Sequence, residues 1–280
     1  MNFYTVKIVR KQLKLQFWEF GVANISIIPV RSEPSEKSEM LTQILFGEHF
    51  EILKSNDKWA RVRLVFDGYE GWVDKKMILP IPEKLFRKIT EHGDFSVNTV
   101  THQIYDVLEN PMMTIVAGSS LPLFNGKRTF KLVGTRYKLK TKFHFLQKEA
   151  IRDNIKKTAM LYVNAPYLWG GRSPFGIDCS GFAQIVYKIN GAKIPRDANQ
   201  QVNMGVAVNF VNEAKPGDLA FFDNDEGQIV HTGILLGNSK IIHSSGKVRI
   251  DKIDHNGIFS FEQKKYTHKL RVVKDILSYI

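Results

Sequence analysis

The stretch YLWGGRSPFGIDCSGF, residues 167–182, runs from a glycine-rich loop into the expected start of a helix. Its Cys179 is the only cysteine among 280 residues. Four apolar residues then recur at spacings of three and four: Phe182, Ile185, Val186 and Ile189. Asn190-Gly191 predicts the helix end. A helix N-terminus favours negative charge, so this position predicts a thiol of lowered pKa that acts as a nucleophile. The structural alternative is a small buried hydrophobic residue.

Two histidines lie downstream in runs rich in β-forming residues, QIVHTGILLG (228–237) and KIIHSSG (240–246). A hairpin is predicted around Gly237-Asn238-Ser239. His231 and His243 are twelve residues apart, so a loop centred on Gly237 would place them opposite each other on one face, whereas a two-residue turn would shift the register by one. One histidine would then deprotonate the thiol and the other would orient that base. Each histidine alone is more often a structural residue.

Several motifs in one order give residues 165 to about 253 a strong resemblance to the NlpC/P60 cysteine peptidases. They are PYLWGG (166–171), DCSGF (178–182), IPRDANQ (194–200), KPGDL (215–219), HTGI (231–234) and IHSSG (242–246). The resemblance implies an α+β papain-like catalytic domain in which the cysteine-bearing helix packs on an antiparallel sheet that carries the histidines. Members cleave γ-D-glutamyl bonds to diamino acids in peptidoglycan stem peptides, without a metal or other cofactor.

The resemblance also implies a role for each matching residue. Cys179 would be the nucleophile, His231 the general base and His243 the orienting third residue, while Tyr167 would help the Cys179 N–H stabilise the oxyanion. Five further positions match substrate-binding residues: Trp169, Asp178, Ser180, Arg196 and Asp197. Ala198 stands where relatives usually have serine, which puts one substrate hydrogen bond in doubt.

The front of the chain is predicted to form a small β-barrel. Short alternating runs at 24–30, 50–54, 60–65 and 71–73 are separated by turn signals. The motifs PVRSEPS (29–35), LFGE (45–48) and DGYEGWV (67–73) resemble a bacterial SH3-like domain found in cytoplasmic muropeptide endopeptidases. That resemblance implies a wall along the active-site groove. Glu48 and Tyr69, assisted by Asp197, would bind the free amine of the N-terminal L-Ala.

We therefore predict a multidomain chain: an α+β papain-like catalytic domain preceded by one or two small all-β SH3-like barrels. The expected division is listed in chain order: an N-terminal extension at 1–19, a first SH3-like domain at 20–82, a second SH3-like domain with its linker at 83–147, and the catalytic domain at 148–280. Residues 80–88 are expected to be the linker, and residues 146–162 a helix that opens the catalytic domain.

The chain is basic, with a formal net charge of +12. Between Lys127 and Lys157, eleven Lys or Arg residues stand against Glu149 and Asp153. Alternating lysines at 138, 140 and 142 are typical of a solvated or edge strand face. No nucleic-acid motif accompanies them, so we expect no nucleic-acid partner, and weak attraction to acidic polymers is the alternative.

Residues 1–20 contain scattered Lys and Arg and no uninterrupted apolar core, which argues against a secretory signal. No run approaches the ~20 apolar residues of a membrane span. A lone cysteine forms no internal disulfide. These features predict a cytoplasmic protein without a membrane partner and leave its oligomeric state open. The family resemblance implies a small murein stem peptide as the substrate.

Three functions from different classes remain. The leading hypothesis is an endopeptidase that recycles free muropeptides, with an intact-wall hydrolase as its close alternative. The second is a non-catalytic wall-binding protein, against which the set Cys179, His231 and His243 stands. The third is a Zn²⁺ site made by the same cysteine and two histidines.

Overall fold

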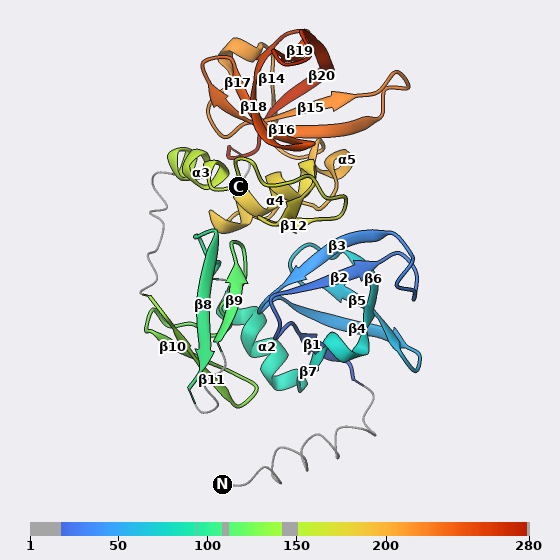
Figure 1. Cartoon of the computed structure of the whole chain (residues 1–280), viewed down its shortest axis with the longest axis vertical. Coiled ribbons are helices and arrows are strands. Elements are labelled where there is room, and N and C mark those ends of the chain that lie inside the picture. Colours follow the sequence, from blue (N-terminus) through green and yellow to red (C-terminus); the bar gives the residue numbers. More distant parts are fainter. Residues whose placement is uncertain (1–17, 94, 108–111, 142–150, 279–280) are drawn as a thin grey trace.

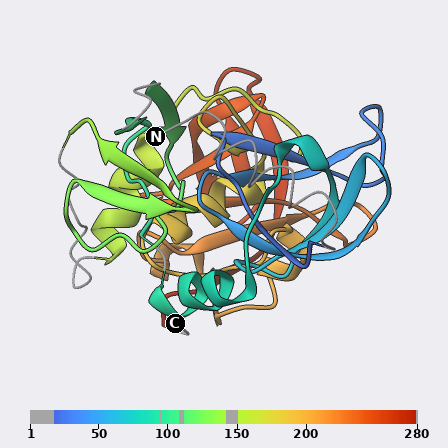
Figure 2. The same ribbon diagram turned by 90° about the horizontal axis from the view of Figure 1, so that it is seen from below.

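The computed structural model describes residues 18–93, 95–107, 112–141 and 151–278. Three parts follow one another along the chain (Figure 1). Two β-rich units lie side by side at one end, and the C-terminal part, with its central helix and barrel, covers them; a view from below shows the same arrangement (Figure 2). The predicted extension at 1–19 falls almost wholly outside the described residues. Within the described ranges, every helix is too short or too polar to cross a membrane.

The first unit is an all-β SH3-like region, as expected. Its seven antiparallel strands run in the spatial order β3-β2-β6-β5-β4-β1-β7. They are β1 (Phe20–Val22), β2 (Ile27–Arg31), β3 (Met40–Leu45), β4 (His49–Ser55), β5 (Trp59–Leu64), β6 (Glu70–Asp74) and β7 (Leu79–Pro80), with the 3-10 turn η2 (Lys75–Met77) before β7. Alternate residues of β2 are buried, as period-two patterning requires, and Ile28 and Val30 enter the core.

The second unit combines a helix with a four-stranded antiparallel sheet in the order β10-β11-β8-β9. Its strands are β8 (Thr101–Asp106), β9 (Met112–Val116), β10 (Thr129–Leu132) and β11 (Thr135–Leu139). The segment expected to be a linker is instead helix α2 (Glu83–His92). Its Leu85, Phe86 and Ile89 lie three and four residues apart and pack into a core that both β units share.

The C-terminal part contains the expected helix and sheet. Helices α3 (Ile151–Met160), α4 (Cys179–Ile189) and α5 (Ala198–Gln201) accompany two short strands, β12 (Arg172–Ser173) and β13 (Gly176–Ile177), and the 3-10 turn η4 (Val211–Glu213). The main antiparallel sheet comprises β14 (Val206–Val208), β15 (Leu219–Asp223), β16 (Ile229–Gly237), β17 (Lys240–Ser245), β18 (Lys247–Asp254), β19 (Gly257–Ser260) and β20 (Lys265–Asp275). Pairing of β19 with β20 closes six of these strands, β15 to β20, into a barrel.

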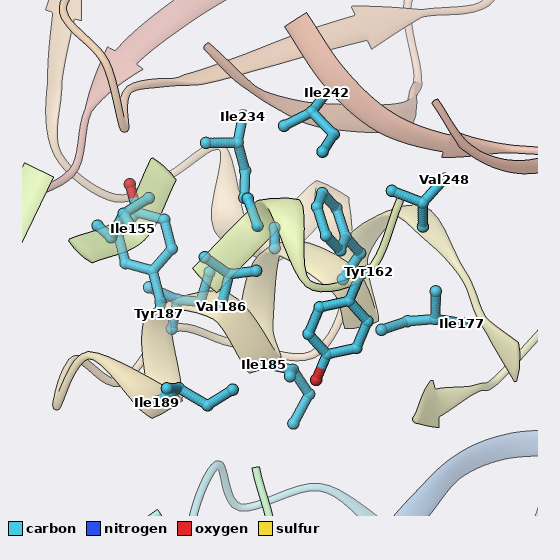
Figure 3. Close-up of a cluster of buried hydrophobic side chains, with 14 of the residues drawn as sticks. Ile155, Tyr162, Ile177, Ile185, Val186, Tyr187, Ile189, Ile234, Ile242 and Val248 are labelled. Carbon is cyan, nitrogen blue, oxygen red and sulfur yellow. The ribbon is translucent and has the colours of Figure 1, made fainter. Parts of the chain in front are cut away.

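Helix α4 lies at the centre of this part. All eleven of its residues are buried, so the helix is enclosed on every side. Figure 3 shows Ile185, Val186 and Ile189 of α4 among side chains from α3 and the sheet. Because interiors pack at nearly crystalline density, this enclosure fixes the position of the helix start relative to β16 and β17.

Candidate active site

The start of α4 holds the cysteine, as the sequence predicts. Cys179 is the first residue of the helix, and Asp178 is its N-cap. Asp178 Oδ1 accepts a hydrogen bond from Gly181 N at 2.7 Å, and Asp178 Oδ2 accepts one from Gly170 N at 2.9 Å. The cap therefore fixes both the helix start and the preceding glycine loop.

The environment of the thiol corrects the expectation of a lowered pKa. Cys179 is 8% exposed. Burial, with the nearby charge of Asp178, raises the pKa of Cys179 to about 11. The backbone N–H groups of Thr232 and Ser180 and the charge of Arg196 act in the opposite direction but are outweighed. The resting thiol is therefore protonated, and a base must remove its proton during attack.

The two predicted histidines meet, but not in the predicted register. Ile234 pairs with Ile242, so His243 stands opposite Gly233 and is offset from His231 by two residues. The two strands join through a two-residue turn, Asn238 and Ser239, and a β-bulge between Leu235 and Gly237 shifts the pairing by one residue. The offset is even, so both side chains stay on one face, and His231 Nε2 lies 2.8 Å from His243 Nδ1.

A carboxylate that the sequence analysis missed, Asp251, follows the two histidines. We call His231, His243 and Asp251 the histidine row. His243 Nε2 lies 3.0 Å from Asp251 Oδ2, and Arg249 Nη2 donates to Asp251 Oδ1 at 3.1 Å. Although burial opposes ionisation of Asp251, hydrogen bonds from His243 and Arg249 lower its pKa. A carboxylate only accepts, so His243 donates from Nε2 and accepts at Nδ1. His231 then donates from Nε2, which leaves its Nδ1 as the basic nitrogen.

His231 is neutral at rest. Burial, followed by the neighbouring His243 and His268, lowers its pKa well below 6.5. The ring of His268 stacks on that of His231 with centroids 4.2 Å apart. A neutral imidazole with an open Nδ1 is the form that a general base requires.

Tyr167 lies next to the reacting group on the loop before α4. Burial, then the charges of Cys179 and Asp178, raise its pKa to about 12, so the phenol stays protonated. Tyr167 N donates to Gly246 O at 3.0 Å, which ties the tyrosine to the turn after β17. A protonated phenol beside Cys179 is a preorganised donor for an oxyanion.

A groove of about 470 Å³ runs between the first β unit and the C-terminal part. Three residues of the first unit form one wall: Glu39, Leu41 and Tyr69. The other lining residues belong to the C-terminal part: Trp169, Asp178, Cys179, Ser180, Arg196, Asp197, Ala198, Asn199, Ile229 and Val230. The groove therefore brings Cys179 together with six of the seven predicted substrate-binding residues.

Two groups of contacts shape this groove. Arg196 forms a two-pronged ion pair with Asp178, at 3.0 Å from Oδ1 and 2.5 Å from Oδ2, and it also donates to Ser180 Oγ at 3.0 Å. On the wall, Tyr69 OH donates to Asp197 Oδ2 at 3.1 Å. The three polar residues at the helix start thus hold one another, while Tyr69 and Asp197 join the two parts across the groove.

Glu39 is a groove residue that the sequence analysis missed. Its Oε1 accepts from Trp169 Nε1 at 2.6 Å. No local signal marked it, because Glu39 stands in a charged turn before β3 and only domain packing brings it to the groove. Asp251 did carry a signal: a charged residue within the alternating strand Lys247–Asp254, which the turn at Gly246 folds back along β17.

Glu48 lies outside the groove, which corrects the role that the resemblance implied for it. Its carboxylate is 3% exposed. Oε1 accepts from Lys188 Nζ at 2.6 Å and Arg172 Nη2 at 3.0 Å, and Oε2 accepts from Leu45 N at 2.8 Å and Arg172 Nη1 at 2.9 Å. Every favourable direction around the carboxylate is therefore occupied by this protein's own donors.

The charge state of Glu48 agrees with a structural role. Burial alone would raise its pKa, but attraction to Arg172 and Lys188 and their hydrogen bonds lower it to about 2. Lys188 lies on α4, and its Nζ also donates to Gly118 O in the second unit at 2.9 Å. Glu48 thus fastens all three parts of the chain rather than binding a substrate amine.

Among the described residues, the grouping that can hold a metal differs from the predicted one. One ring nitrogen each from His231, His243 and His268 lies within 4.8 Å of the others, and Cys179 is not a member. The expectation of a reaction without a metal stays a prediction.

The family comparisons match both ends of the described chain. Residues 164–271 match the NlpC/P60 family, and residues 30–78 match the bacterial dipeptidyl-peptidase Sh3 domain. These ranges contain the cysteine, the histidine row and the groove wall.

Curated relatives extend the similarity over most of the chain. The γ-D-glutamyl-L-lysine dipeptidyl-peptidase of Bacillus subtilis (strain 168) is 31% identical over 217 residues, covering 72% of this chain and 71% of that protein. Dipeptidyl-peptidase 6 of Lysinibacillus sphaericus is 27% identical, covering 80% of this chain and 88% of the relative. A crystal structure of an NlpC/P60 family protein from Bacillus cereus ATCC 10987 has a TM-score of 0.77 at 22% identity, covering 92% of this chain and 99% of that chain, and it supports the fold.

Proposed function

The chain belongs to the NlpC/P60 family of cysteine peptidases, and we propose that it hydrolyses the γ-D-glutamyl bond to the diamino acid of peptidoglycan stem peptides whose N-terminal L-Ala is free. Two similar proteins are named γ-D-glutamyl-L-lysine dipeptidyl-peptidases. The observation that carries the proposal is the groove in which a carboxylate pair, Glu39 and Asp197, faces the same space as Cys179. The alternative of a non-catalytic wall-binding protein is set aside, because the cysteine and histidine row is complete.

The reaction follows from the tautomers of the histidine row. As Cys179 Sγ attacks the scissile carbonyl carbon, its proton passes to His231 Nδ1, and the imidazolium is stabilised by His243 and, through it, by Asp251. The carbonyl oxygen becomes an oxyanion near the Cys179 N–H, which has no intrahelical partner at the first helix position, and near the Tyr167 phenol. His231 then protonates the leaving amine, and a thioester remains.

Water completes the cycle. His231 Nδ1 takes a proton from water, the hydroxide attacks the thioester carbonyl, and the thiolate leaves and is reprotonated. The high pKa of the buried thiol means that the thiolate appears only within this sequence of proton transfers. The row from His231 to Asp251 is therefore required in both half-reactions.

The groove supports recognition of a free amine. Glu39 and Tyr69 line the groove from the first unit and Asp197 lines it from the C-terminal part, so a substrate ammonium in the groove would have two carboxylates and a phenol oxygen as partners. A muramyl group on the same nitrogen would remove the positive charge and add bulk against the wall. In this proposal Glu39 takes the place that the sequence analysis gave to Glu48.

The test compares L-Ala-γ-D-Glu-L-Lys with its N-acetylmuramyl form by HPLC, using wild-type protein and Cys179→Ala as the inactive control. We expect cleavage of the free peptide and strong discrimination against the blocked one. Equal rates on both would contradict the free-amine requirement and favour an intact-wall hydrolase, and no cleavage of either would contradict the proposed bond.

We also propose that the substrate is a free wall fragment undergoing recycling in the cytoplasm. Fractionation of cells that produce the native protein, followed by immunoblotting, tests this location. Recovery outside the cytoplasmic fraction would count against recycling without affecting the chemistry.

A further inference from the structure

His268 is a titratable residue that stacks on the general base His231 and has no part in the proposed reaction. It lies on β20, across β15 from the histidine-bearing strand β16. Its ring stacks on His231 at 4.2 Å and stands nearly perpendicular to His243 at 5.5 Å between centroids. One nitrogen from each of the three rings lies within 4.8 Å of the others. We propose that these three histidines form an inhibitory site for a divalent transition-metal ion such as Zn²⁺.

Hydrogen bonds already orient the lone pairs of two of the three rings for a metal. His243 holds its Nε2 proton toward Asp251 at 3.0 Å, which leaves Nδ1 as a ligand atom. His268 Nδ1 lies 2.9 Å from Thr267 Oγ1, which leaves its Nε2. Metal-binding histidines ordinarily hold their second nitrogen in such a bond to a carboxylate or another polar group. His243 and His268 therefore have outer partners of the kind a three-histidine site requires, and His231 must exchange its tautomer.

His268 must turn out of its stack on His231 before three nitrogens can share one ion, because two nearly parallel stacked rings cannot both direct their in-plane lone pairs at one point. Ligands in tetrahedral geometry about 2.1 Å from Zn²⁺ lie roughly 3.4 Å apart. The closest pair, His231 Nε2 and His243 Nδ1, lies 2.8 Å apart and must open slightly, while His268 must approach. His268 is the partly exposed member, so its ring is the one with room to turn. A fourth position would stay open to water.

The donor set suits the ion. Imidazole nitrogen is among the ligands that Zn²⁺ prefers. His231 and His243 are buried and His268 is partly exposed, so the ion could enter from the side of His268.

A metal ion bound at this site would prevent His231 from acting as the general base. When His231 Nε2 coordinates the ion, its proton moves to Nδ1, with no net gain or loss of protons. Nδ1 then carries a hydrogen and cannot accept the proton of Cys179. The ion also takes the His243 Nδ1 lone pair, which in the reaction accepts the hydrogen bond from His231 Nε2. Metal binding and catalysis therefore exclude each other, and a chelator reverses the inhibition. The ion would inhibit here, whereas a catalytic metal would take part in the reaction.

The binding test uses Cys179→Ala protein without a histidine tag, titrated with ZnCl2 by isothermal calorimetry. This background removes the thiol and does not depend on the proposed peptidase activity. We expect one bound ion per chain and at least a tenfold weaker affinity when His268→Phe, which keeps an aromatic ring to stack on His231, is added. The control is His255→Phe, an exposed histidine on the turn between β18 and β19, which should leave the affinity unchanged.

Two outcomes would overturn the proposal: loss of Zn²⁺ binding in Cys179→Ala alone, which would assign the ion to the thiol, or an unchanged affinity in the His268→Phe protein. Co²⁺ added to wild-type protein gives a readout that needs no variant. Three-nitrogen ligation predicts visible ligand-field bands without a sulfur-to-cobalt charge-transfer band, and a strong charge-transfer band would contradict the site. In the activity assay, the inhibitory Zn²⁺ concentration should rise at least tenfold in His268→Phe, normalised to that variant's own rate without metal.

Discussion

Glu48 and Glu39 are two carboxylates of the first unit that both reach the C-terminal part, and they do different things. Glu48 is buried and accepts four hydrogen bonds from backbone, Arg172 and Lys188. Glu39 lines an open groove and has an indole donor, Trp169, at 2.6 Å. The comparison teaches that a carboxylate at a domain boundary binds a ligand only if packing leaves part of its accepting capacity unfilled.

The largest effect is expected on the rate of hydrolysis, from a substitution in the groove. Cys179→Ala should lower the rate of stem-peptide hydrolysis by at least roughly a thousandfold, because it removes the nucleophile. It removes little volume, so the thermal unfolding midpoint should change little. HPLC of cleavage products and calorimetry of the same preparation check both. Substantial residual hydrolysis would sink the assignment of Cys179.

Removal of the buried carboxylate charge should act on stability instead. Glu48→Gln leaves Arg172 and Lys188 buried without their counter-charge, which should cost about 3 to 5 kcal/mol of unfolding free energy. Urea unfolding measures this, with Glu51→Gln as the control because Glu51 is an exposed carboxylate on β4, the strand that begins directly after Glu48. If Glu48→Gln unfolds normally but has a raised KM, Glu48 contacts substrate after all.

The ionised Glu48 carboxylate also makes the unfolding free energy depend on pH. The pKa of folded Glu48, about 2, lies below its ordinary 4.5, so the contribution is fully present above pH 4.5 and is lost as pH falls toward 2. The loss is on the order of 3 kcal/mol. Wild-type protein should therefore lose more unfolding free energy between these pH values than Glu48→Gln does. Parallel acid titrations in urea would contradict the assignment if both proteins lost the same amount.

Substitution of Asp251, at the end of the histidine row, should lower turnover less than loss of Cys179 does. Asp251→Asn can donate to His243 and so allows the wrong tautomer, and we expect kcat to fall about tenfold to a hundredfold with KM little changed. Asp254→Asn, which lies on the same strand and accepts from Tyr266, is the matched control. An unchanged kcat in Asp251→Asn would show that His243 alone orients the base.

The smallest effect is expected at the wall of the groove. Glu39→Gln should raise KM for the free tripeptide roughly tenfold, equivalent to about 1.4 kcal/mol, because the substrate ammonium loses one charged partner. Stability should hold, in contrast to Glu48→Gln. The exposed Glu36→Gln serves as control. A KM that stays at the wild-type value would show that Glu39 does not bind the substrate amine. Asp197 and Tyr69 would then be the amine site, and neither Glu39 nor Glu48 would contact substrate.

Predictions from sequence were accurate where neighbouring residues decide the outcome. The helix beginning at Cys179 and four of the seven strands of the first unit, β2, β4, β5 and β6, were located from periodicity and turn residues. The segment at 80–88 was misjudged because its prolines resemble a linker, whereas apolar residues at 85, 86 and 89 give it a helical face once a partner surface exists. The second SH3-like assignment, the domain boundaries and the location stay predictions.

The sequence by itself determined that one thiol begins a helix and that the two histidines lie on the two strands of one hairpin, because helical spacing and turn residues are local properties. Only the tertiary structure decided the two-residue offset of His231 and His243, the high pKa of Cys179 and the different roles of Glu48 and Glu39. These depend on burial and on partners far away in the chain, such as Lys188, which lies 140 residues from Glu48. A side chain's charge, solvation and free hydrogen-bonding capacity are set by what packs against it, and that packing exists only in the folded chain.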